Sequence, residues 1–275
     1  SIKKLKRGDK VAILSPSSAA PAKWPHVYKL GIKRLEEEFG LVPVEYPTTK
    51  NNGSTGKERV ADLQSAFSDP EIKGVITTIG GDNQITYVKH IKPKIFMENP
   101  KPFFGFSDNT HLSNFLWLNG IPSYYGGSIF TQYALEGGMD NFTTKYLNIA
   151  LFKKGEFELE QSKIFNDKGL DWNDPSTLTK KREYEKNEGW YWDGHKSVQG
   201  ITWGGCLESI DELMRHGEQL PSLEHFTNIV LMTETSEEMP SSDYCFRVYR
   251  ALGERGILTK VKAVLNGRPQ AWFFD

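Results

Sequence analysis

The chain has 275 residues, of which 38% are hydrophobic and 25% charged, so a disordered or collagen-like protein is excluded and two domains are expected. Its 34 basic and 35 acidic side chains nearly cancel, so no general field favours a nucleic-acid polymer or an anionic membrane as partner. No apolar run approaches the ~20 residues of a membrane span, and the basic N-terminus lacks the apolar stretch of a signal peptide. We therefore expect a cytoplasmic protein.

Short apolar runs alternate with stretches of helical spacing through the first half of the chain. The predicted strands are residues 10–15, 41–46, 74–79, 101–106 and 121–125, and the predicted helices between them are residues 25–39, 57–67 and 110–118. Strand–helix alternation with short connections predicts an α/β fold with a doubly wound parallel sheet. Ligands bind such sheets at the carboxyl ends of the strands, which here are the loops at 15–20, 80–83 and 107–110.

The alternation breaks after about Tyr133. A glycine-containing joint at 136–140 and a predicted helix to Phe152 lead into residues 161–196, a long polar stretch whose length indicates a functional loop. Predicted strands at 198–203, 228–232 and 261–265 then enclose helices at 206–215 and from Ser241 onwards. We expect a domain at 1–135, a connecting segment at 136–196 and a smaller α/β domain at 197–275.

The two cysteines and six histidines are not spaced as the ligands of a metal site. Cys206 and Cys245 lie far apart and form no C-x-x-C pair, and the histidines show no metal-ligand spacing. We therefore expect no metal site. A single disulfide stays open, although two thiols fit a reducing compartment better.

Ser107 stands in the sequence GFSDN between a predicted strand and a predicted helix. A nucleophile on such a turn projects its hydroxyl, and backbone N–H groups of the first helical turn can stabilise an oxyanion. Asn109 breaks the hydrolase pattern G-x-S-x-G. The alternative is that Ser107 only caps the helix.

Gly80 and Gly81 follow the apolar strand GVITTI and precede Asp82. Two glycines at a strand end let a substrate approach the backbone and free N–H groups to face it. The sequence matches neither G-x-G-x-x-G nor a P-loop. A plain tight turn is the alternative.

Glu234 follows the apolar run NIVLM near the end of a predicted strand. A carboxylate there can orient a histidine or act as a base, whereas the alternative is a solvated acidic loop with Glu237 and Glu238.

His111 lies one helical turn after Ser107 and is expected to face along the helix, as a core or surface residue.

Trp190, Tyr191 and Trp192 stand in a polar segment flanked by glycines. Exposed aromatic rings can stack on a base or another ring. The alternative is that they fold back on their own domain.

Taken in order, these segments resemble the LD-carboxypeptidase / microcin C self-immunity family of serine peptidases, over essentially the whole chain. The matching stretches are LKRGDKVAILSPSS, GVITTIGGDNQ, KPFFGFSDNTHL, GWYWDG, GITWGGCLE, LMTETSEEMPSSD and GRP. ETSEE and the Trp-rich segment are closer to the microcin-immunity-like branch.

The resemblance implies a flavodoxin- or Rossmann-like first domain, a smaller C-terminal α/β domain and a Ser–His–Glu triad. By motif, Ser107 matches the nucleophile and Glu234 the acid, while the N–H of Asp108 and one from Gly80-Gly81, taken as Gly81, would form the oxyanion hole. Gly80, Asp82, Trp190 and Trp192 would bind substrate, without a metal or organic cofactor. The partner would be a small peptide or peptidyl-nucleotide, and a homodimer is open.

One departure concerns the base. The family's histidine lies in a G-H-T-like motif beyond G-R-P, and no histidine of this sequence stands there. Three hypotheses follow: a truncated or disordered peptidase whose base lies elsewhere, a non-catalytic binding relative, or a sugar- or nucleotide-binding α/β domain unrelated to hydrolysis. We expect the first, with an apparently incomplete second domain and a chain that is catalytically incompetent as given.

Overall fold

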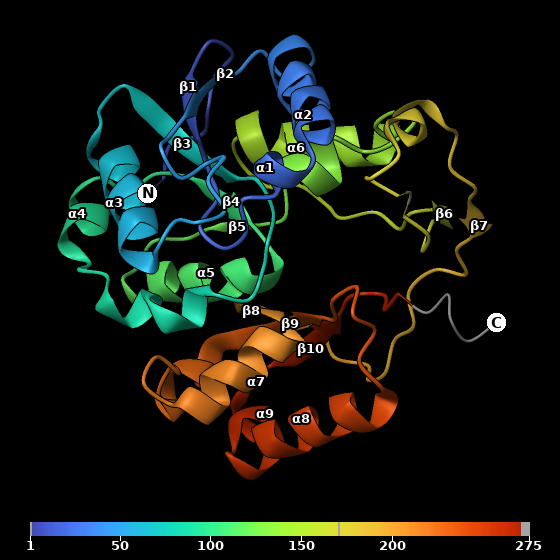
Figure 1. Ribbon diagram of the computed structural model, residues 1–275. Coiled ribbons are helices and arrows are strands. Elements are labelled where there is room, and N and C mark those ends of the chain that lie inside the picture. Colours follow the sequence, from blue (N-terminus) through green and yellow to red (C-terminus); the bar gives the residue numbers. More distant parts are fainter. Residues whose placement is uncertain (1, 170, 271–275) are drawn as a thin grey trace.

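The computed structural model describes residues 2–169 and 171–270 and contains a five-stranded parallel sheet (Figure 1). Its strand order is β2-β1-β3-β4-β5, with every neighbouring pair parallel. The strands are β1 (Lys10–Leu14), β2 (Val42–Glu45), β3 (Ile72–Thr77), β4 (Phe103–Gly105) and β5 (Tyr124–Tyr125). The predicted doubly wound sheet is confirmed.

Helices cover both faces of this sheet. They are α1 (Ala20–Lys23), α2 (Pro25–Glu37), α3 (Gly56–Ser68), α4 (Lys94–Glu98), α5 (Thr110–Leu118) and α6 (Asn141–Phe152). Successive residues of β1 point to opposite faces: Val11 and Ile13 join the core with α2 and α6, whereas Ala12 and Leu14 join the core with α3, α4 and α5. Burial on both faces explains why the strand is continuously apolar.

A second, three-stranded parallel sheet has the order β10-β9-β8. Its strands are β8 (Ile201–Cys206), β9 (Ile229–Glu234) and β10 (Ala263–Asn266), and its helices are α7 (Leu207–His216), α8 (Ser242–Glu254) and α9 (Ile257–Lys260). As predicted, Ser241 caps α8 by accepting a hydrogen bond from the backbone N–H of Tyr244. The domain expected at 197–275 includes residues 271–275, which lie outside the described residues.

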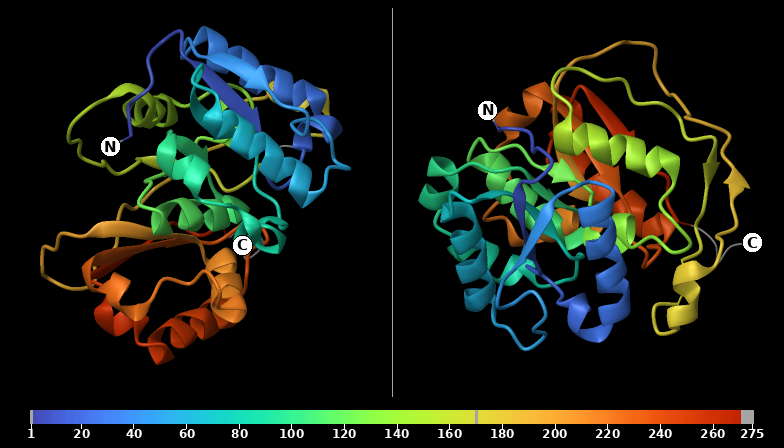
Figure 2. Two further views of the ribbon diagram at one scale, coloured as in Figure 1. Left: turned by 90° about the vertical axis from the view of Figure 1, so that its left-hand side faces the viewer. Right: turned by 90° about the horizontal axis from the view of Figure 1, so that it is seen from above.

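Helix α5 connects the two sheets (Figure 2). The backbone N–H of Cys206 donates to Thr110 Oγ1 over 3.0 Å, and Trp203 Nε1 donates to Asn114 Oδ1 over 3.0 Å. These bonds fix the carboxyl end of β8 against the first turn of α5. Since β9 runs parallel to β8, its last residue, Glu234, also ends near that turn.

The strand predicted at 198–203 ends too early, because β8 continues through Gly204 and Gly205 to Cys206. A Cβ on Gly204 would stand 1.7 Å from the carbonyl oxygen of Met232, and one on Gly205 would stand 2.5 Å from Thr110 Oγ1. The two glycines therefore allow β8 to approach β9 and α5 closely, which a turn-based interpretation of Gly-Gly does not detect.

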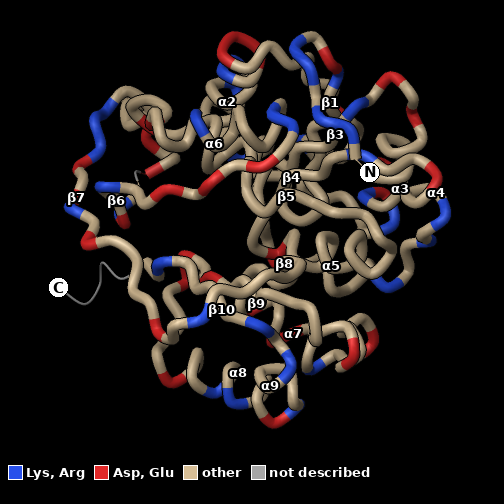
Figure 3. Tube along the Cα trace, turned by 180° about the vertical axis from the view of Figure 1, so that it is seen from behind, with Lys and Arg blue, Asp and Glu red and all other residues tan. Residues whose placement is uncertain are grey.

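Residues 161–196, expected as one long loop, contain the short antiparallel pair β6 (Ile164–Phe165) and β7 (Glu185–Lys186) and a 3₁₀ turn at Pro175–Thr179. Charges of both signs follow each other along this segment and the outer helices, whereas β4 and β5 carry none (Figure 3). Among the described residues, no helix is long and apolar enough to cross a membrane.

Candidate active site

Ser107 begins the 3₁₀ turn Ser107–Asn109 that links β4 to α5. Its backbone φ is +58°, in the left-handed region that residues with a Cβ rarely adopt. The predicted turn is therefore confirmed, and its backbone is strained at Ser107. The Ser107 side chain makes no capping hydrogen bond, so the interpretation of Ser107 as a mere helix cap is not supported.

Asn109 explains how the turn is held in this shape. Its fully buried side chain donates through Nδ2 to the carbonyl oxygens of Phe106 (3.0 Å) and Ile79 (3.2 Å), and its Oδ1 accepts from Gln84 Nε2 (2.8 Å). Gly105 is required here because a Cβ would stand 2.9 Å from that of Asn109. One buried amide thus connects the Ser107 turn to the loop that follows β3, and it occupies the position where the hydrolase pattern has glycine.

Gly80 lies directly against Ser107. A Cβ on Gly80 would stand 2.7 Å from Ser107 Cβ and 2.9 Å from Ser107 Oγ, so the serine hydroxyl faces this glycine. Gly81 instead approaches Ser17 and Ser18, and its φ of +154° suits glycine. Asp82 is exposed. The structure brings the glycine pair to the predicted nucleophile, and the oxyanion-hole role of Gly81 and the substrate-binding roles of Gly80 and Asp82 stay predictions.

Asp108 follows Ser107 and buries its carboxylate, which is only 2% exposed. Oδ2 accepts hydrogen bonds from the backbone N–H groups of Asn83 (3.0 Å) and Gln84 (3.1 Å). Burial raises the pKa of Asp108, and the hydrogen bonds with Ser17, Gln84 and Asn83 oppose that rise. The carboxylate anchors the turn, so the backbone N–H of Asp108 has a fixed position.

Tyr125, at the end of β5, connects the two sheets in front of Ser107. Its hydroxyl accepts a hydrogen bond from the backbone N–H of Ser107 (3.0 Å) and donates to Glu234 Oε1 (2.5 Å). The tyrosine oxygen therefore links the Ser107 turn to the Glu234 carboxylate through two hydrogen bonds. Sequence reasoning missed Tyr125, although its place at the end of the strand beside β4 was a usable signal.

Glu234 is half-buried at the end of β9. Burial raises its pKa, the carboxylates of Glu208 and Glu237 add to the rise, and the hydrogen bond from Tyr125 opposes it. The same neighbourhood raises the pKa of Tyr125, chiefly through burial. The alternative of a solvated loop does not hold for Glu234, because β9 extends to this residue.

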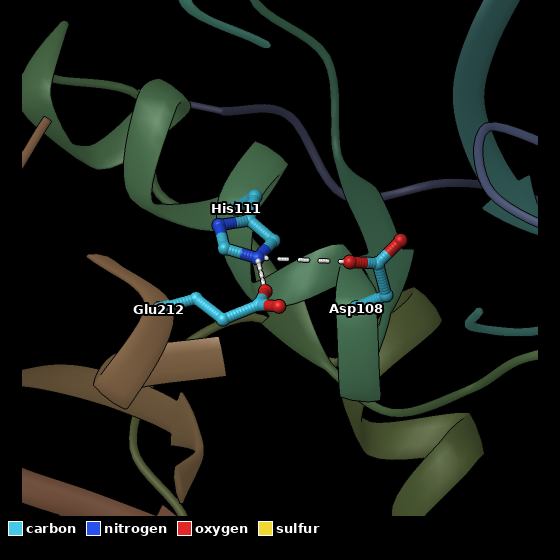
Figure 4. A group of neighbouring side chains, drawn as sticks. All are labelled: Asp108, His111 and Glu212. Atoms are coloured by element: carbon cyan, nitrogen blue, oxygen red, sulfur yellow. Dashed lines mark hydrogen bonds and ion pairs between the residues drawn. The ribbon is translucent and has the colours of Figure 1, made fainter. Parts of the chain in front are cut away.

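All six histidines lie within the described ranges, and none of them forms a hydrogen bond with Ser107 or Glu234 there. His111 is fully buried, as one of the expected alternatives has it, and its Nε2 faces Glu212 Oε2 at 3.0 Å and Asp108 Oδ1 at 3.6 Å (Figure 4). No local sequence pattern indicates this group, because Glu212 is 101 residues away on α7.

The aromatic segment does not fold into a core. Trp190, Tyr191 and Trp192 are 46%, 92% and 68% exposed, and the two indoles meet edge to face at 5.8 Å. Their rings are accessible to a ligand, and their role in substrate binding stays a prediction.

Two sequence profiles match the chain: the LD-carboxypeptidase N-terminal domain at residues 11–126 and the LD-carboxypeptidase C-terminal domain at residues 199–272. The microcin C7 self-immunity protein MccF of Escherichia coli is 24% identical over 267 residues, or 95% of this chain and 76% of that protein.

Solved structures agree with these matches. The MccF-like protein of Bacillus anthracis has a TM-score of 0.88 at 26% identity, over 98% of this chain and 80% of that one. The MccF-like protein of Streptococcus pneumoniae, solved in complex with AMP, has a TM-score of 0.82 at 26% identity, over 96% of this chain and 83% of that one. Because the two profiles together cover more than half of its residues, the chain belongs to the LD-carboxypeptidase family of peptidases.

Proposed function

We propose that the protein is a serine amidase that hydrolyses a terminal amide by acyl transfer, with Ser107 as nucleophile and Glu234 as the acid of a Ser–His–Glu triad. The observation that carries this proposal is the position of Ser107. It has a positive φ at the carboxyl end of β4, its hydroxyl faces Gly80, and one tyrosine hydroxyl connects its N–H to Glu234. Strain of this kind gathers at reactive residues.

The reaction would proceed in two steps. Ser107 Oγ attacks the amide carbonyl carbon, its proton passes to an imidazole, and the tetrahedral oxyanion accepts hydrogen bonds from the N–H groups of Asp108 and Gly81. Collapse expels the amine, which takes the proton back from the imidazolium. Water then attacks the acyl-Ser107 ester and releases the acid. Glu234 keeps the imidazole oriented and stabilises its charged form.

The mechanism needs an imidazole as general base, and no histidine among the described residues forms a hydrogen bond with Ser107 or Glu234. Since no histidine contacts Ser107 or Glu234 among the residues that the structure describes, we expect the 275 residues alone to be nearly inactive. Glu234 is a poor substitute, because even a carboxylate with a raised pKa is a weak base toward a hydroxyl. The same observation supports a second candidate, a non-catalytic relative that binds the substrate and leaves it intact.

For the substrate we propose a peptidyl- or aminoacyl-nucleotide, with the terminal D-alanine of a murein tetrapeptide as the runner-up. The exposed rings of Trp190 and Trp192 offer a stacking surface for a base. The relative from Streptococcus pneumoniae, which was solved with AMP, supports a nucleotide at this kind of site.

The test measures turnover of an aspartyl-adenylate mimic with a cleavable amide and of a murein tetrapeptide, each with and without free imidazole. We expect imidazole to restore hydrolysis of the adenylate mimic, and Ser107→Ala to abolish that imidazole-dependent rate. Binding of the mimic without hydrolysis under any condition would favour the non-catalytic relative. Full turnover without imidazole would show that the assignment of the base is wrong.

A further inference from the structure

Three potential ligand atoms, from the Ser107 turn, α5 and α7, lie close together beside that turn. Asp108 Oδ1, His111 Nε2 and Glu212 Oε2 all lie within 4.8 Å of one another. Asp108 and His111 are one helical turn apart, so the backbone itself places them side by side. Glu212 reaches them from α7, and Figure 4 shows its carboxylate directed at the same imidazole nitrogen as that of Asp108.

The charges of this group are unbalanced. Two carboxylates face one imidazole, and among the described residues neither Asp108 nor Glu212 forms an ion pair with a lysine or arginine. The arginine one turn along α7, Arg215, pairs with Asp211 instead. Since a buried carboxylate without a cation is costly, a positive ion at this point would stabilise the fold.

The two distances from the imidazole nitrogen to the carboxylates are close to those around a bound ion. A four-coordinate ion about 2.1 Å from nitrogen and oxygen ligands holds those atoms about 3.4 Å apart. His111 Nε2 lies 3.0 Å from Glu212 Oε2 and 3.6 Å from Asp108 Oδ1. The other oxygen of Asp108 is held by the N–H groups of Asn83 and Gln84, which leaves Oδ1 directed at the imidazole. Such outer hydrogen bonds typically orient metal-binding carboxylates.

One member of the group, Glu212, reaches the surface. The Glu212 side chain is 38% exposed, and it lines a hollow together with Glu208, Glu238 and Tyr244. Three carboxylates and one guanidinium, that of Arg215, line this hollow, so its net charge favours a cation beside Glu212.

We propose that Asp108, His111 and Glu212 form a binding site for one divalent transition-metal ion, of which Zn²⁺ is the best match. One imidazole and two carboxylates suit Zn²⁺ or Mn²⁺ and are a poor set for Mg²⁺ or Ca²⁺, which prefer oxygen alone. The ion would join α5 to α7 and thereby fix the second sheet beside Ser107. The site shares Asp108 with the Ser107 turn, but its test measures metal binding and not hydrolysis, so its failure would leave the proposed function standing.

The test titrates ZnCl₂ into the chelator-treated chain in a calorimeter and compares the wild type with Glu212→Gln. Glu212→Gln keeps the size of a half-exposed side chain while weakening one ligand. We expect one equivalent of Zn²⁺ to bind and the affinity to fall at least ~10-fold in Glu212→Gln. At the same Zn²⁺ concentration the melting temperature should rise more in the wild type than in Glu212→Gln. Glu218→Gln, an exposed carboxylate that pairs with Lys89, is the matched control and should bind as the wild type does.

His111→Asn provides a second variant, and Glu212→Gln alone decides the matter if His111→Asn does not fold. A tenfold excess of Mg²⁺ should leave the Zn²⁺ titration unchanged. The proposal is overturned if no stoichiometric binding is seen, or if Glu212→Gln binds Zn²⁺ as tightly as the wild type.

Discussion

The two sides of the candidate active site are built differently. On the side of the first sheet, Ser107, Asp108 and Asn109 belong to a network of buried hydrogen bonds that includes the loop after β3. On the side of the second sheet, Glu234 and Glu212 are half-buried carboxylates at a strand end and on a helix. The nucleophile is thus placed by its own local backbone, whereas the acids depend on how the two sheets meet.

Ser107→Ala has the largest expected effect. The imidazole-dependent rate should fall to the uncatalysed background, while the free energy of unfolding stays within ~1 kcal/mol, because Ala keeps the Cβ and the backbone strain. Ser107→Gly should be equally inactive but more stable than Ser107→Ala by about 1 kcal/mol, since glycine adopts φ +58° without strain. Equal stabilities in urea unfolding would contradict the strained turn.

Glu234→Gln tests the second side of the site. The imidazole-dependent rate should fall on the order of 10³-fold, because the amide cannot stabilise an imidazolium. The pKa of Glu234 is raised in the folded protein, so the folded state binds this proton more tightly than the unfolded one. Stability from this group is therefore lost as pH rises from the unfolded pKa through the folded one. When the pH is raised from 4 to 7, the free energy of unfolding measured in urea should fall less, or rise more, in Glu234→Gln than in the wild type. A change in the opposite sense would refute the assigned direction.

Gly80→Ala tests the contact between the two loops of the first sheet. The added methyl group would collide with Ser107 Cβ and Oγ, so we expect a rate lower by a factor on the order of 10² and a destabilisation of about 1–3 kcal/mol. Gly253→Ala, where the new Cβ would find only Leu258 at 3.7 Å, is the control and should change neither quantity by much. Similar behaviour of the two variants would remove Gly80 from the site.

Trp190→Ala has the smallest expected effect and addresses substrate choice alone. The exposed indole contributes little to folding, so stability should stay within ~0.5 kcal/mol. Affinity for the adenylate mimic should fall roughly 10-fold, as lost base stacking implies, and affinity for the murein tetrapeptide should stay the same. A loss that is equal for both ligands would argue against stacking on a base.

The difference between local backbone and contacts across the two sheets also explains which features could be predicted from the sequence. The strand–helix alternation and the sequence GFSDN are local patterns, and they predicted the first sheet and the place and backbone of Ser107. The Ser107–Tyr125 and His111–Glu212 contacts join segments that are distant in the sequence, and local periodicity cannot predict such contacts. The end of β8 was predicted too early for a related reason. Gly204 and Gly205 are required by close contacts with Met232 and Thr110, which are distant in the sequence.

The most direct test of the central claim, that Ser107 is the nucleophile, is mass spectrometry of an acyl-enzyme. An N-acyl-aspartyl nitrophenyl ester has a leaving group that needs no general acid, so acylation should depend less on an imidazole than amide hydrolysis does. We expect a burst of nitrophenolate and one acyl group on the peptide that contains Ser107, with neither in Ser107→Ala. An acyl group on another residue, or equal acylation of Ser107→Ala, would contradict the claim.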